Sequence, residues 1–250
     1  MTTELLTKKI QQCRAATNES FAPQNTTLDE FRSPYDQTLT DLNVTAASPL
    51  SEDWLQRLWT LHTEPTRHYH TVIHLQEMLE YFEALREDLK LSQQQEATIV
   101  MSIYFHDAIY DPHSGTNEED SEQLWRSFAK NVNMSEQLKD LVEEVSTYIL
   151  ATKKHSVNPN NSPALALFLD LDLAVLAKES SAYASYAAMI RREYQFVPVE
   201  TYCSKRPEIL EAMASQEQLY GSPAFQGVEE KARRNLLNEV ELLRKGEIPS

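Results

Sequence analysis

Apolar residues recur every three or four positions along most of the chain after residue 50, which is the period of an amphipathic α-helix. Residues 73–89 and 99–109 show this period most clearly. Thr71 can cap the first of these helices, and Ser92 with Gln95 forms a capping-box pair before the second. No stretch alternates convincingly between apolar and polar residues as a half-buried β-strand would. The pattern therefore predicts an all-α fold.

Further helices follow from the same period and from residues that commonly begin or end a helix. Ser51 can cap a helix that ends at Pro65, and Pro163 suits the first turn of a later one. The remaining predicted helices are residues 117–131, 135–152, 162–177, 180–195, 198–214 and 227–245. Residues 51–250 are accordingly expected to form one compact multi-helix bundle of roughly eight to ten helices.

Residues 1–50 are interpreted as a polar N-terminal extension outside this domain. A short amphipathic helix is expected around residues 5–13. The Thr-rich segment after it is interrupted by Pro23, Pro34 and Pro49, so it is expected to be irregular or partly disordered. We expect the function to lie after residue 50.

The amino-acid composition limits the kinds of partner that the protein is expected to bind. The 250 residues include 38 Asp and Glu against 23 Lys and Arg, a net charge of −15, which disfavours a nucleic acid polymer or an anionic membrane surface. A site for an anionic ligand must supply its own positive charge, and a metal ion is one way to do so. Two cysteines cannot build a disulfide framework, and the longest apolar run is far too short to span a bilayer. We expect a cytoplasmic protein, with no prediction of its oligomeric state.

Candidate chemistry lies in the histidines and in carboxylates on apolar segments. All seven histidines fall between residues 62 and 155. His74 lies near the start of one predicted helix, and His106 with Asp107 lies inside another. On a helix these two neighbours are about 100° apart and can reach one ion, whereas Asp170 and Asp172 are about 200° apart and cannot. Spacing alone favours a metal site and ordinary core histidines about equally.

The donor types indicate which ions such a site would take. Two imidazoles and two carboxylates form a mixed nitrogen and oxygen set. This set suits Mn²⁺, Fe²⁺, Co²⁺, Ni²⁺ or Zn²⁺, with Mg²⁺ as an alternative. The sequence does not decide between one ion and two.

Several segments in order resemble the HD superfamily of metal-dependent phosphohydrolases, whose signature is a His, a His-Asp pair and a distant Asp on a helical fold. They are RHYHTVIHLQEML, YFHDAIYDP, NEEDSEQLW, ILATKKH, FLDLDLAVL, IRREY and ARRNLLNEV. They are most similar to a predicted phosphohydrolase family with a YH-x₃-H opening, and the likeness extends from about Trp54 to Arg244. It implies an HD-type domain with the metal ligands His74, His106, Asp107 and Asp172. Asp172 is preferred to Asp170 because Asp-Leu-Ala resembles the start of the family's final ligand helix.

The resemblance implies hydrolysis of a phosphate ester or phosphoanhydride in a small phosphorylated molecule by a metal-activated water. A nucleotide is one candidate substrate. Asp107 is expected to orient the water as well as bind the metal. His70, one turn before His74, is a candidate donor to the leaving oxygen or a phosphate, and a helix-entry hydrogen bond explains it equally well. Glu118 is a candidate acid/base residue, although a helix-dipole partner is the favoured interpretation.

Phosphate requires cationic partners beyond the metal. Arg67, just before the first histidine cluster, and Arg191 in IRREY are the two arginines predicted to bind phosphate, because a guanidinium suits bidentate contacts. His155 is a third candidate, either for phosphate or for a second metal. An exposed helix face is the better explanation for four other basic residues, Lys205, Arg206, Arg233 and Arg234.

Two other functions stay open. Relatives of inositol oxygenase use an HD-type helical fold to hold two irons and activate O₂, which requires additional ligands such as His70, His113 and His155. The other is a catalytically silent helical module that binds a metal and a nucleotide or protein, which the intact ligand quartet disfavours. A hydrolase is the preferred prediction.

Overall fold

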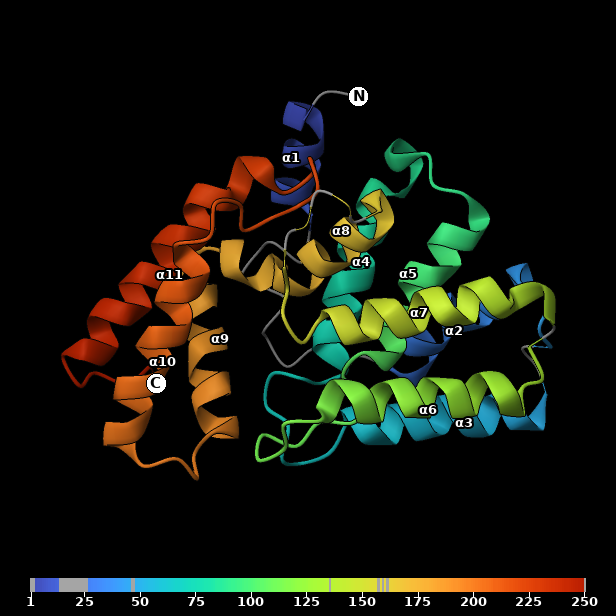
Figure 1. Cartoon of the computed structure of the whole chain (residues 1–250), viewed down its shortest axis with the longest axis horizontal. Coiled ribbons are helices and arrows are strands. Elements are labelled where there is room, and N and C mark those ends of the chain that lie inside the picture. The colour runs from blue at the N-terminus through green and yellow to red at the C-terminus, as the bar shows by residue number, and fades with distance from the viewer. Residues whose placement is uncertain are drawn as a thin grey trace.

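The computed structural model describes residues 3–13, 27–45, 48–134, 136–156, 158, 160 and 162–249. These residues form eleven α-helices and three short 3₁₀ helices, and they contain no β-strand, so the predicted all-α class is confirmed (Figure 1). The α-helices are α1 (Thr3–Gln12), α2 (Leu28–Asp41), α3 (Pro49–His62), α4 (Val72–Leu89), α5 (Gln93–Phe105), α6 (Asn117–Asn131), α7 (Lys139–Ala151), α8 (Pro163–Asp172), α9 (Ser180–Glu193), α10 (Val199–Ala214) and α11 (Glu229–Arg244).

Three helices meet in the middle of the molecule. Each of α4, α5 and α8 contacts the other two. On one side, α11 packs against both α9 and α10, and on the other α7 packs against both α5 and α6 (Figure 1). Elements far apart in the sequence therefore surround one central junction. This junction carries the candidate site.

Most predicted helix starts are found where the capping residues indicated. The predicted cap Ser51 is wrong, because it lies inside α3 and the side chain of Ser48 caps that helix. Thr71 caps α4 through its side chain, and Ser92 with Gln95 closes a capping box at the start of α5. The predicted helix over residues 162–177 is instead α8 followed by a 3₁₀ helix, η4 (Leu173–Ala177). The change of helix type falls directly after Asp172, which becomes the last residue of α8. The predicted helix over residues 135–152 begins as a 3₁₀ turn at Glu136, and residue 135 lies outside the described residues.

The N-terminal 50 residues differ from the expectation of one short helix followed by irregular chain. Helix α2 runs through Pro34, and its first turn is held by a capping box between Thr27 and Glu30. Its buried face includes Phe31, Tyr35 and Leu39, which belong to the hydrophobic core. Burial of this face compensates for the backbone hydrogen bond that Pro34 cannot donate. The part of the predicted irregular segment that falls within residues 14–26 lies outside the described residues. The division of the chain at residue 50 stays a prediction.

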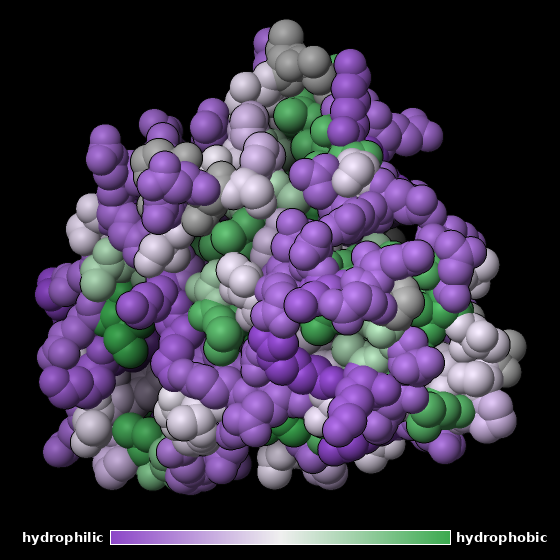
Figure 2. Space-filling view, turned by 45° about the vertical axis from the view of Figure 1, so that its right-hand side comes forward, coloured by the Kyte–Doolittle hydropathy of each residue, from purple (hydrophilic) through white to green (hydrophobic). Residues whose placement is uncertain are grey.

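Hydrophilic residues predominate on the face shown in Figure 2, with apolar residues scattered between them. Among the described helices, none combines the length and the apolar character needed to cross a lipid bilayer.

Candidate metal centre

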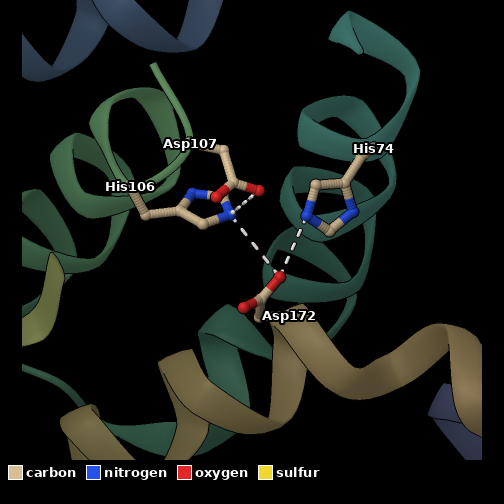
Figure 3. Close-up of side chains that lie close together, drawn as sticks. All are labelled: His74, His106, Asp107 and Asp172. Atoms are coloured by element: carbon tan, nitrogen blue, oxygen red, sulfur yellow. Dashed lines mark hydrogen bonds and ion pairs between the residues drawn. The ribbon is translucent and has the colours of Figure 1, made fainter. Parts of the chain in front are cut away.

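Four side chains that the sequence analysis assigned to a metal ion meet at the central junction (Figure 3). His74 lies in the first turn of α4, and Asp172 ends α8. His106 and Asp107 directly follow α5. One ligand atom from each side chain lies within 4.8 Å of all the others, and no other such group of three or more His, Cys, Asp or Glu occurs among the described residues. This group could hold a metal ion.

Asp172 is the side chain that links the group. Its Oδ1 lies 2.9 Å from Nε2 of His74 and 3.5 Å from Nε2 of His106. Nε2 of His106 in turn lies 3.1 Å from Oδ2 of Asp107. Both imidazoles are almost fully buried, whereas the two carboxylates keep 19% and 12% of their side-chain surface exposed. The histidines therefore form the inner side of the site and the carboxylates its outer side.

The hydrogen bonds of His106 test whether a cation fits here. Nδ1 lies 3.0 Å from the carbonyl oxygen of Ile103, so Nδ1 must carry a proton. Nε2 is buried without a hydrogen-bond partner, yet it faces the carboxylates of Asp107 and Asp172. The lone pair of a neutral ring would then point at two negative charges, which is repulsive unless a proton or a metal ion lies between them. The donor set therefore fits a divalent cation.

The pKa values reflect the same charges. Burial disfavours an imidazolium at His106, but the carboxylates of Asp107 and Asp172 outweigh burial and raise its pKa well above the ordinary value. Burial also disfavours the Asp172 carboxylate, yet His106 and then the hydrogen bonds from His155 and His74 hold its pKa well below the usual range. Metal ions compete with protons for these atoms, so ion binding at this group is expected to release protons.

Two helix ends strengthen the attraction for a cation. The pair His106 and Asp107 was expected inside a helix, but α5 ends at Phe105 and His106 is its C-cap residue. Helix α8 likewise ends at Asp172. The carboxyl end of an α-helix carries partial negative charge and favours a cation nearby. The termination of two helices at the group thus adds to the charge of its carboxylates.

Asp170 and Asp172 have different contacts, and only Asp172 belongs to the candidate metal group. The Asp170 carboxylate accepts the backbone N–H groups of Gly221 and Ser222 at 2.8 and 2.6 Å. It is buried, which raises its pKa to about 7. Asp170 therefore anchors the segment before α11, on a different side of α8 from the metal group, as the 200° separation requires.

Two more side chains contact the ligands directly. The Tyr69 hydroxyl lies 3.0 Å from Nδ1 of His74, and the Tyr69 ring packs edge-on against Tyr186 of α9. Nε2 of His155 lies 2.6 Å from Oδ2 of Asp172. Partners of this kind fix the orientation of metal ligands. His155 thus lies at the group, and its predicted phosphate or second-metal role stays a prediction.

Arg67 lies beside the group, but its guanidinium already has partners. It donates to the carbonyl oxygens of Asp107 at 2.6 Å and Ala108 at 2.9 Å, and also to that of His70 at 3.2 Å. The side chain is almost fully buried. Its predicted contact with phosphate would require these bonds to break. In this structure Arg67 ties the backbone that carries Asp107 to the segment before α4.

The other predicted residues have partners outside the group. The Arg191 guanidinium donates to the carbonyl oxygens of Tyr194 and Val197 after α9, so its donors too have backbone partners. Glu118 opens α6 and lies 3.7 Å from the ammonium of Lys153. His113 stacks on Phe196 and bonds Asp111 in an exposed loop, outside the metal group. The catalytic role of Glu118 and the phosphate role of Arg191 stay predictions.

Glu193, the last residue of α9, is a buried carboxylate that sequence reasoning missed. Its Oε1 accepts the backbone N–H groups of residues 68, 69 and 70. Its Oε2 lies 2.7 Å from Nδ1 of His70 and accepts the Tyr110 hydroxyl at 2.9 Å. Burial opposes the charge of Glu193, but His70 outweighs it and lowers the pKa to about 2. A single Glu in IRREY, far along the chain from His70, carries no local signal of this contact.

No protein-family model matches the chain, and no curated protein matches it. The arrangement of the four side chains is compatible with an HD-type site.

Proposed function

We propose that this protein is a metal-dependent phosphohydrolase that acts on a small phosphorylated molecule. The observation that carries the proposal is the convergence of His74, His106, Asp107 and Asp172, with a buried His106 nitrogen that faces two carboxylates. When bound there, a divalent cation supplies Lewis-acid activation of a phosphoryl oxygen and of the attacking water. A nucleotide is the first substrate class to test.

The chain's own residues have separate tasks in this proposal. The carboxylates of Asp107 and Asp172 keep part of their surface exposed, so a ligand can reach the group at these two side chains. Asp107 orients the water that adds to phosphorus, and the bond from phosphorus to the leaving oxygen breaks. His70, whose ring lies 6.1 Å from that of His74, gives the leaving oxygen its proton. Arg67 keeps Asp107 in position through its bonds to the backbone.

The test combines metal analysis with a phosphate-release screen. Protein purified without added metal is analysed for bound metals, and it is then loaded with Mn²⁺, Co²⁺, Ni²⁺, Zn²⁺ or Mg²⁺ and assayed on nucleotides and sugar phosphates. We expect release from at least one substrate class, lost in His106→Ala and Asp107→Ala. His113→Ala is the matched control, because His113 lies outside the group. No release from a broad panel, or unchanged release by both variants, would contradict the proposal.

One observation favours a second candidate, a di-iron oxygenase. His155 contacts the Asp172 oxygen that does not face His74 and His106, where a second ion would need a ligand. Two irons per chain and an O₂-dependent visible absorption band would favour the oxygenase. One metal per chain, tight ligand binding and no turnover would instead indicate a silent binding module.

A further inference from the structure

The two carboxylate oxygens of Glu193 have different hydrogen-bond partners. Oε1 accepts three consecutive backbone N–H groups, at 2.8 Å from His68, 2.8 Å from Tyr69 and 3.1 Å from His70. Oε2 faces side chains instead, with the His70 ring at 2.7 Å and the Tyr110 hydroxyl at 2.9 Å. The side chain is fully buried, so these contacts are shielded from water. One carboxylate thereby holds both the backbone and the ring of the segment that precedes α4.

The His70 ring is fixed from two directions. Its Nδ1 meets Oε2 of Glu193, and its face stacks on Tyr110 with ring centroids 4.1 Å apart. A carboxylate can only accept, so Nδ1 of His70 must carry the proton of this bond. Nε2 is then the nitrogen that can exchange a proton with a ligand. The ring keeps 19% of its side-chain surface exposed, which leaves it accessible to a ligand.

We propose that Glu193 is a positioning residue that sets the orientation and the tautomer of His70, so that Nε2 is presented for proton transfer at the metal centre. The inference rests on the proposed function for its effect on turnover, but the geometry itself can be tested without turnover. Glu193 is the last residue of α9, and from there its side chain reaches a segment more than a hundred residues earlier in the chain. A buried carboxylate that orients an imidazole is a recurrent device in acid–base catalysis.

Glu193→Gln separates the two tasks of the carboxylate. The amide oxygen can still accept the three backbone N–H groups, whereas the NH₂ group that replaces Oε2 cannot accept from Nδ1 or from Tyr110. We expect kcat to fall about 10²-fold or more, with KM and metal content within about twofold of the wild type. Glu200→Gln removes the same charge from an exposed position at the start of α10 and is expected to leave kcat unchanged.

A double-variant cycle distinguishes positioning from a purely structural role. If Glu193 acts through His70, then Glu193→Gln and His70→Gln lower kcat by similar factors, and the double variant is no slower than the slower single one. Additive losses, or a Glu193→Gln defect confined to KM or to metal content, would overturn the inference.

Nitrogen NMR of histidine-labelled, metal-loaded protein provides the readout that does not depend on activity. His70→Gln identifies the His70 signals by their loss. At a pH where the ring is neutral, we expect a protonated Nδ1 and an unprotonated Nε2 in the wild type, and the reverse tautomer in Glu193→Gln. An unprotonated Nδ1 in the wild type, or unchanged signals in the variant, would overturn the inference. If the wild type releases no phosphate, the proposed function is wrong, and this spectrum alone decides the role of Glu193.

Discussion

At the scale of single residues, the buried guanidinium of Arg67 holds the backbone at Asp107 and Ala108. Two different nitrogens of its planar fork donate to the carbonyl oxygens of Asp107 and Ala108, whereas a lysine offers one compact ammonium that cannot reproduce this geometry. We therefore expect Arg67→Lys to lower metal affinity about 10- to 100-fold by releasing the backbone of a ligand. The measurement is competition for Zn²⁺ against a chelator of known affinity. Arg192→Lys, exposed on α9, is the matched control, and equal affinities in both variants would contradict this role.

The burial of His62 predicts how the stability of the fold depends on pH. It is fully buried, and burial, followed by the charge of Arg67, lowers its pKa from 6.5 to about 3. The unfolded chain thus takes up a proton below pH 6.5 that the folded protein does not accept until about pH 3. The stability from this group is complete above pH 6.5 and is lost as the pH falls, by about 2 kcal/mol at about pH 5.

His62→Leu should remove this dependence. Urea denaturation at about pH 7.5 and about pH 5 measures it, and the wild type is expected to lose about 2 kcal/mol more than the variant between these values. His113→Leu serves as the comparison, because the His113 side chain is largely exposed. Equal losses in the wild type and His62→Leu would show that the imidazole of His62 is not held neutral by the fold.

The sequence allowed us to predict the four clustered side chains of the candidate site, but not the contacts that Glu193 and Arg67 make near it. Helical geometry alone separated Asp170 from Asp172, and the resemblance of the flanking segment selected Asp172, which lies in the metal group. Glu193 could not be found in this way, because its partner His70 lies on another element and nothing in the spacing of the two residues links them. The donors of Arg67 were also unpredictable, since they are occupied by carbonyl oxygens that no side-chain pattern records.

At the scale of elements, α2 tests how much the N-terminal region contributes to the fold. Leu39 is fully buried in the core, although it lies in a segment whose Thr-rich sequence and Pro34 predict irregular chain. We expect Leu39→Ala to lower the free energy of unfolding by about 2–5 kcal/mol, because it creates a cavity. Leu50→Ala on α3 is the comparison, since 40% of Leu50 is exposed. Urea denaturation that gives both variants the same stability would contradict the packing of α2.

The helices were predictable where the capping residues and the apolar period agree, as at Thr71 and Ser92. They were not predictable where a capping signal and a helix-breaking residue occur in the same segment. In α2 the capping box and the buried residues Phe31 and Tyr35 outweigh the proline, and only the facing core determines that outcome. Likewise, the apolar run of residues 164–169 predicts a helix but gives no sign of where α8 becomes 3₁₀.

At the scale of the whole molecule, the net charge is −15, and among the described residues few charged side chains are buried. Among the described residues, the buried acidic side chains are Glu77, Asp170, Glu193 and Glu239. Each of these carboxylates accepts at least one hydrogen bond from another part of the chain. The remaining acidic residues create a negative potential around the protein that repels anions, whereas the metal centre attracts cations through its own carboxylates.

This charge distribution predicts how kcat/KM depends on salt concentration. The dependence should be opposite to that of an enzyme whose positive surface charge attracts an anionic substrate. Under the proposed function the substrate is an anion, so it would approach the candidate metal centre against the field of the surface. Screening shortens the range of that field, with a Debye length of about 10 Å at 0.1 M salt. We therefore expect kcat/KM for a small phosphate substrate to rise about twofold or more between about 20 mM and about 300 mM KCl, while kcat stays constant. Steady-state kinetics at fixed pH and metal concentration measure this, and a fall in kcat/KM with salt would show that positive surface charge steers the substrate instead.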